Sequence, residues 1–166
     1  MRFLAAVALL LLPFAGCLEG GAGRYFPPPS DLPDGLVPYA SDSPDWQMVA
    51  PLLGLSSNPG RVGALDRLPG HDLGQVAAAH AYLLKGSSPH EPYAIFVLEF
   101  RSDADIGAHL AEGGAHACDG QEVGHVLRDG HVYVLVGGDG STAHGRQVLA
   151  DLADAVKARS GATLVC

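Results

Sequence analysis

The side chains with the clearest potential for chemistry are eight histidines, a large number for a chain of 166 residues. Imidazole nitrogens bind zinc and copper when several of them converge on one point. His109 and Glu112 are three residues apart, which places them on one face of a helix, and His116 follows shortly after. These three are the candidate metal ligands. The chain lacks H-x-E-x-H, H-E-x-x-H and paired C-x-x-C motifs, so scattered solvated histidines are the competing interpretation.

A second candidate is the glycine-rich stretch Gly138-x-Gly140-x-x-Ala143, which lies between a strand-like and a helix-like run. Dinucleotide-binding folds use such glycines to bring a phosphate close to the N-terminal amides of a helix. Here the preceding strand belongs to a hairpin rather than to a parallel βαβ unit, and Asp139 would add negative charge to the anion site. We therefore expect a turn followed by a capped helix, and no cofactor.

Nucleophilic catalysis finds little support, because the chain has no G-x-S-x-G motif. Glu99 interrupts an otherwise apolar strand, and a buried carboxylate there needs a partner such as Arg101 or a histidine. Alternatively, Glu99 marks the exposed end of the strand. We expect a protein that is not an enzyme. A hydrolytic enzyme that joins Glu99, a histidine and a serine is the lowest-ranked alternative.

The elements that must position these side chains lie mainly in the second half of the chain. The run QVAAAHAYLL is ambiguous, because its alanines favour helix whereas its alternate residues could share one strand face; we expect a strand. The β-branched and aromatic run YAIFVLEF predicts a second strand. Ser102 begins a helix with a pattern close to a capping box, and two further strand-like runs are joined by Asp129-Gly130. Ser141 or Thr142 caps a last helix that stops at Gly161. The expected order is ββαββα with a possible short final strand. It predicts a two-layer α+β domain, with a mostly antiparallel sheet and two helices on one face.

The Asp129-Gly130 pair also predicts the pairing register of its two strands. With a two-residue turn at 129–130, His131 lies opposite Arg128 and His125 lies opposite Val134. These two histidines therefore do not meet across the hairpin.

The first residues indicate where the protein resides. Arg2 precedes about a dozen apolar residues, a run that is too short to span a bilayer, which takes about 20, and that has the form of a secretory signal. The run ends in Phe14-Ala15-Gly16-Cys17, which resembles the lipobox of prokaryotic lipoproteins. The resemblance implies that residues 1–16 are a signal peptide and that Cys17 becomes the lipidated first residue. The alternative is an ordinary secretory signal that is cut elsewhere.

The segment 17–45 reads as a lipidated N-terminus followed by a flexible tether that is rich in proline and glycine. In the alternative interpretation, Tyr25, Phe26 and Trp46 pack onto the domain. Residues 46–166 are expected to form a single globular domain by length.

Charge limits the class of partner. The chain has 10 lysine and arginine residues against 18 acidic ones, a net charge of −8, and removal of Arg2 makes the balance one unit more negative. Nucleic acid is therefore excluded as an expected partner, because its binding depends on cationic side chains. Attachment to a membrane would depend on the lipid rather than on this charge.

If Cys17 carries lipid, Cys118 and Cys166 remain as an even pair in a compartment where disulfides persist. A disulfide between them would close a loop of roughly 50 residues and stabilise the fold by up to about 4 kcal/mol.

Together these features predict an exported protein, lipid-anchored at the cell membrane or envelope and facing outside the cytoplasm. Its small non-catalytic domain would bind an envelope protein or a small ligand. The alternative is an extracytoplasmic zinc- or copper-binding protein that uses its histidines.

Overall fold

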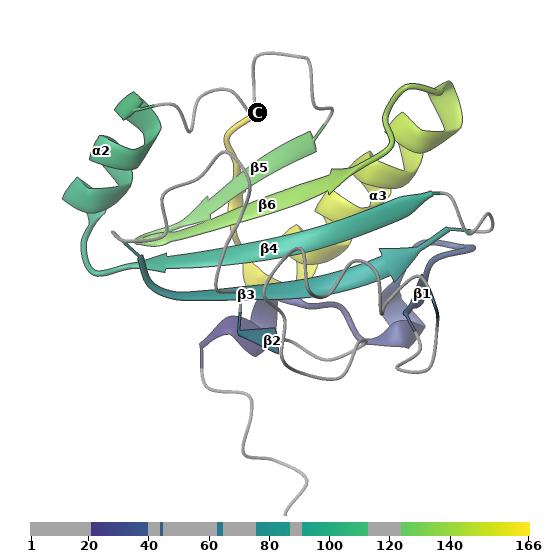
Figure 1. Cartoon of the computed structure of the whole chain (residues 1–166), viewed down its shortest axis with the longest axis horizontal. Helices are drawn as coiled ribbons and strands as arrows, with labels where there is room; N and C mark the ends of the chain where they lie inside the picture. Colours follow the sequence, from purple (N-terminus) through teal and green to yellow (C-terminus); the bar gives the residue numbers. More distant parts are fainter. Residues whose placement is uncertain (1–20, 40–43, 45–62, 65–75, 87–90, 113–123) are drawn as a thin grey trace, which may run out of the picture.

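The computed structural model describes residues 21–39, 44, 63–64, 76–86, 91–112 and 124–166. Its centre is an open antiparallel sheet of six strands in the order β1-β3-β4-β6-β5-β7, and β2 pairs with β3 beside β1 (Figure 1). The strands are β1 Val37–Pro38, β2 Gly63–Ala64, β3 Val76–Lys85, β4 Pro92–Phe100, β5 Gly124–Asp129, β6 Val132–Gly138 and β7 Thr163–Leu164. The helices are α2 Asp103–Glu112, α3 Ala143–Ser160 and the two short 3₁₀ helices η1 Ala22–Tyr25 and η2 Pro29–Asp31. From β3 onward the order is ββαββα with a short final strand, as expected, and the α+β fold class is confirmed. The short strands β1 and β2, which precede this series, were not expected.

Both long helices begin, and α3 ends, where the sequence signals predict. At α2, the Ser102 hydroxyl accepts a hydrogen bond from the amide of Asp105 at 3.3 Å and donates one to its carboxylate at 2.9 Å. At α3, the Thr142 side chain accepts a hydrogen bond from the amide of Gly145 at 2.9 Å. Gly161 ends α3 in the left-handed conformation, with φ 76°, which glycine adopts without a Cβ clash.

The two faces of the sheet are both apolar, and each has its own core. On one face, alternate residues of β4 and β6 pack against the apolar side of α3. The intervening residues of β4 and β6 point to the opposite face of the sheet. There they form a second cluster that includes Ile106 of α2. The two helices are therefore distributed over opposite faces, whereas we expected both on one. The reason is that β4 and β6 carry apolar side chains at consecutive positions. Both faces of the sheet are therefore apolar, and each must be shielded from water by other elements.

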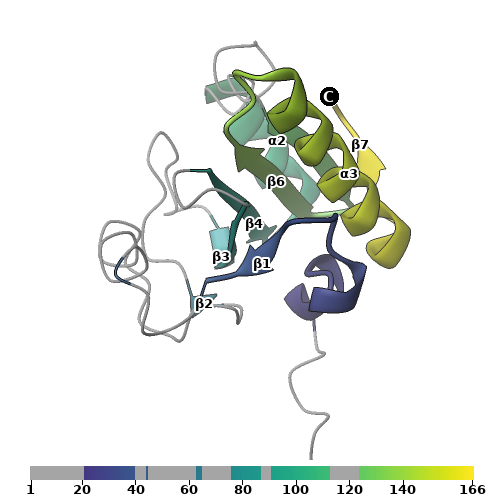
Figure 2. The same cartoon turned by 90° about the vertical axis from the view of Figure 1, so that its right-hand side faces the viewer.

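The segment before the sheet joins the first of these cores. Ala22, Tyr25, Phe26 and Leu36 are all buried in the cluster that contains α3, and the Phe26 ring meets Tyr82 of β3 edge-on at 5.7 Å. Figure 2 shows η1 and the chain leading to β1 alongside α3. Residues 21–39 are thus part of the folded domain, although the prolines led us to expect a tether over 17–45.

Sheet width explains this difference. A helix is about 10 Å wide, whereas six strands about 4.8 Å apart span about 24 Å. α3 alone leaves the β3 side of its face open, and Tyr25, Phe26 and Leu36 fill that space. Trp46, the third aromatic residue considered for such packing, lies outside the described residues.

The hairpin of β5 and β6 forms as expected but with its turn one residue later. Asp129 pairs with Val132, so the two turn residues are Gly130 and His131. Gly130 has φ 57°, and glycine is favoured at the first turn position in hairpins of type II′. The expected register was therefore wrong: Arg128 lies opposite Tyr133 and His125 lies opposite Val136.

Candidate functional site

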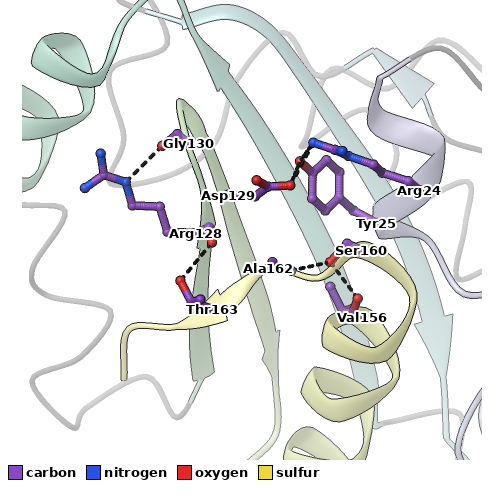
Figure 3. Close-up of polar contacts among 9 residues, drawn as sticks. All are labelled: Arg24, Tyr25, Arg128, Asp129, Gly130, Val156, Ser160, Ala162 and Thr163. Atoms are coloured by element: carbon purple, nitrogen blue, oxygen red, sulfur yellow. Dashed lines mark hydrogen bonds and ion pairs between the residues drawn. The ribbon is translucent and has the colours of Figure 1, made fainter.

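A cluster of three polar side chains joins the N-terminal segment to the β5–β6 hairpin. The Arg24 guanidinium lies 2.7 Å from the Asp129 carboxylate and donates a hydrogen bond to the Tyr25 hydroxyl at 2.6 Å. The Tyr25 hydroxyl donates to the same Asp129 oxygen at 3.0 Å (Figure 3). We call these three residues the Arg24–Tyr25–Asp129 cluster.

The environment of this cluster raises the pKa values of both Tyr25 and Arg24. Burial raises the pKa of Tyr25; the hydrogen bond from Arg24 lowers it, and the hydrogen bond to Asp129 raises it. The hydrogen bond to Tyr25 raises the pKa of Arg24, and the nearby Asp129 and Glu99 add to this effect. At neutral pH the Tyr25 hydroxyl is therefore protonated, and it accepts from a cation while donating to an anion.

Further hydrogen bonds surround the same turn. The Arg128 side chain donates to the carbonyl oxygen of Gly130 at 2.9 Å and to the Asp103 carboxylate at 3.1 Å. The Thr163 hydroxyl donates to the carbonyl oxygen of Arg128 at 3.1 Å (Figure 3). The start of α2, the turn and the C-terminal strand are thus tied together where the N-terminal segment meets the sheet.

Glu99 lies next to this cluster, on the α3 face of β4. Its carboxylate is 3.8 Å from His80 Nε2, and each side chain is 27% exposed. A Cβ built on Gly21 would be 3.4 Å from the Glu99 carboxylate, so the N-terminal segment passes directly over it. Of the two partners that we expected for Glu99, Arg101 or a histidine, the structure selects a histidine.

The proposed metal ligands are only partly described. His109 is buried at 6% exposure, and its ring lies 5.2 Å from that of Phe100 and 6.1 Å from that of Tyr133. This is the environment of a core side chain that packs against aromatic rings. The Glu112 side chain and His116 lie outside what the structure describes.

A shallow groove of about 360 Å³ separates η2 from the first turns of α3. Its polar lining includes Asp31, Asp34, His144 and Asp151. Asp31 accepts a hydrogen bond from the Ser30 hydroxyl at 2.9 Å, and Asp151 accepts one from Gln147 at 2.8 Å.

In the described part of the chain, no three histidine, cysteine or acidic side chains form a group that could hold a metal ion.

The glycine-rich stretch before α3 adopts a turn, in line with our expectation. The Asp139 carboxylate accepts a hydrogen bond from the amide of Ser141 at 2.9 Å, and hydrogen bonding with Ser141 lowers the Asp139 pKa. A Cβ on Gly145 would clash with the carbonyl oxygen of Asp139. The amides of Ser141 and Gly145 are thus engaged by the Asp139 carboxylate and the Thr142 hydroxyl.

The sites predicted for covalent modification are mostly outside the described residues. Cys17 and Cys118 both lie there, so lipidation and the disulfide stay predictions. Cys166 is half-buried and packs against the second core cluster. Its carbonyl oxygen accepts a hydrogen bond from the amide of Val126 at 3.1 Å.

The Arg24–Tyr25–Asp129 cluster was missed at the sequence level because Asp129 is more than 100 residues from the other two members. Asp129 was explained by the hairpin turn, and Arg24 by an assumed tether. The available signal was the aromatic pair Tyr25-Phe26 in a proline-rich segment, because a solvated tether has no use for two adjacent aromatic rings.

None of the helices in the described ranges is long and apolar enough to cross a membrane. Comparison of the chain with protein-family models, curated proteins and solved structures found no match.

Proposed function

We propose that the protein is an exported lipoprotein whose domain is held at a membrane through a lipid on Cys17. The sequence support is the apolar run that ends in Phe14-Ala15-Gly16-Cys17. The observation that carries the proposal is that Ala22, only five residues after this cysteine, is already buried in the core of the domain. A lipid at Cys17 would therefore act on a segment that the Arg24–Tyr25–Asp129 cluster fastens to the sheet.

The domain itself is proposed to bind a partner or ligand without catalysis. Arg24, Tyr25 and Asp129 are engaged with one another, and such pairing favours a structural junction over a reacting site. Binding would then fall to the remaining surface of the domain, including the groove between η2 and α3.

The direct test of the anchor is mass spectrometry of the mature protein from its native membrane. We expect residues 1–16 to be absent and the new N-terminal Cys17 to carry diacylglycerol. A Cys17→Ala variant is the matched control and should remain unacylated. An unprocessed full-length chain in the cytosolic fraction would overturn the proposal.

We also propose that Cys118 and Cys166 form a disulfide. Cys166 is half-buried and its carbonyl oxygen accepts a hydrogen bond from the amide of Val126. Cys118 precedes Val126 by eight residues. Eight residues can span up to about 28 Å, enough to reach the chain end. A peptide map without reductant should join the two cysteine-containing peptides. Alkylation of both thiols in the unreduced protein would contradict the disulfide.

A further inference from the structure

We propose that one end of the domain faces the bilayer and contacts phospholipid headgroups. This end, called the turn end below, consists of the turn residues Gly130 and His131, η1 and the last turn of α3. The inference rests on the proposed lipid anchor at Cys17, and it assigns a membrane-facing surface to the domain.

The length of chain between the lipid and the fold carries the argument. From Cys17 to Gly21 there are four residue steps, which span at most about 14 Å when fully extended. A tether that reached to residue 45 could instead extend by about 100 Å. With the shorter connection, the surface around Gly21 cannot move away from the headgroup layer.

The contacts of the N-terminal segment identify which surface this is. Gly21 lies against Glu99, and Arg24 and Tyr25 bind Asp129, the last residue before the turn. The amide of Phe100 donates to the carbonyl oxygen of His131 at 2.9 Å. The exposed His131 is therefore close to the point from which the anchored chain leaves the domain.

Positively charged side chains are concentrated at the turn end, the surface that we propose faces the bilayer. Five of the seven lysine and arginine residues in the described ranges belong to the turn end or its immediate neighbours, namely Arg24, Arg101, Arg128, Lys157 and Arg159. Of the nearby acids, Asp129, Asp103 and Glu99 are paired with Arg24, Arg128 and His80. Asp105 bonds to Ser102, and Asp154 is exposed on α3.

Among described residues, the cations Arg101, Lys157 and Arg159 form no ion pair, so they can meet lipid phosphates. Asp31, Asp34 and Asp151 line the groove beside η2 and the first turns of α3, away from the last turn of that helix. In a protein with a net negative charge, an anionic membrane would repel this acidic region and favour contact through the turn end.

The test compares two exposed histidines near opposite ends of the domain, His131 and His144. Each is replaced in turn by an alkyne-bearing amino acid and coupled to a fluorophore, in the full-length acylated protein. The protein is placed in phosphatidylcholine–phosphatidylglycerol vesicles that contain a headgroup-spin-labelled lipid. We expect quenching at position 131 to exceed that at 144 at least about threefold, because the 18-residue α3 separates the two ends by about 27 Å. Equal quenching, or stronger quenching at 144, would overturn the inference.

Two controls separate the inference from the lipid anchor on which it rests. Acylation and sedimentation with vesicles are measured first; loss of both removes the anchor and the inference together. Normal acylation with equal quenching overturns the orientation alone. Insertion of a 20-residue Gly-Ser linker after Glu19 should leave acylation unchanged and reduce the quenching ratio toward one. A ratio that the linker does not change would contradict the role of the short connection.

Discussion

The Tyr25 hydroxyl donates a hydrogen bond to the Asp129 carboxylate at 3.0 Å, across 104 residues of sequence. The tyrosine ring itself is 1% exposed and belongs to the core that α3 covers. Tyr25 therefore contributes to the fold in two separable ways, through its apolar ring and through its hydroxyl.

Substitutions at Tyr25 should separate these contributions. Tyr25→Phe keeps the ring and should lower the free energy of unfolding by about 0.5–1.5 kcal/mol, the usual worth of a hydrogen bond. Tyr25→Ala leaves a cavity and should lower it by about 3–5 kcal/mol, by analogy with other aromatic-to-alanine changes. Urea unfolding measures both. Ser30→Ala, on the exposed surface of η2, is the control and should stay within about 0.5 kcal/mol. A Tyr25→Ala effect as small as this control would show that the segment does not stabilise the domain.

Two glycines of the long helices should respond in opposite directions to alanine. A Cβ at Gly145 meets the carbonyl oxygen of Asp139, whereas a Cβ at Gly107 meets no atom within 4 Å. Gly145→Ala should destabilise the protein by about 1–3 kcal/mol through steric strain. Gly107→Ala should stabilise it by up to about 1 kcal/mol through helix propensity. Thermal and urea unfolding of the pair provide the measurement, and equal effects of the two changes would contradict the close approach at Gly145.

High pH should destabilise the protein through its buried tyrosines. Burial raises the pKa of Tyr133 to about 12, and burial also raises the pKa values of Tyr25, Tyr82 and Tyr93. A raised pKa in the folded state means that the unfolded chain ionises first. The stability that depends on neutral Tyr133 is thus complete below pH 10 and is lost between about pH 10 and 12.

Urea unfolding across this pH range checks the prediction. Between pH 10 and 12, the free energy of unfolding of the Tyr133→Phe variant should fall by about 2–3 kcal/mol less than that of the unmodified protein. Phenolate absorbance gives an independent readout, because one tyrosine should ionise only near pH 12. A full set of tyrosines that titrates near pH 10 in the folded protein would contradict the burial of these side chains.

Zinc and copper binding offers a check on the histidine alternative. Because His109 packs against Phe100 and Tyr133, metal binding there would require this aromatic packing to open. We expect the full-length protein to bind either ion no more tightly than about millimolar, an affinity worth about 4 kcal/mol. Calorimetric titration measures this, with a His109→Phe variant as control. Micromolar affinity that this substitution abolishes would restore the metal-site hypothesis.

Local signals predicted the fold well. The Asp-Gly pair located the β5–β6 hairpin, and Ser102, Thr142 and Gly161 marked helix ends because capping depends only on neighbouring residues. The features that these local signals did not predict depend on three-dimensional packing. The hairpin register depends on which side chains fill each core, and the inward packing of Tyr25 depends on the width of a sheet formed far along the chain.

The candidate site was harder to predict for the same reason. Glu99 stood out as a carboxylate in an apolar strand, and its expected histidine partner proved to be His80. Arg24 and Asp129 each had an adequate local explanation, so nothing in the sequence brought them together. Their pairing follows from the path of residues 21–39 across the sheet.

The edge strands of the sheet affect whether copies of this protein aggregate at high local concentration. β7 at one margin, and β1 and β2 beside β3 at the other, are two residues long each. A two-residue strand offers few unpaired amide and carbonyl groups, and short margins of this kind discourage neighbouring molecules from joining into a continuous sheet. Where β1, β2 and β7 cover β3 and β5, the domain should therefore resist edge-to-edge pairing even when many copies share a confined surface.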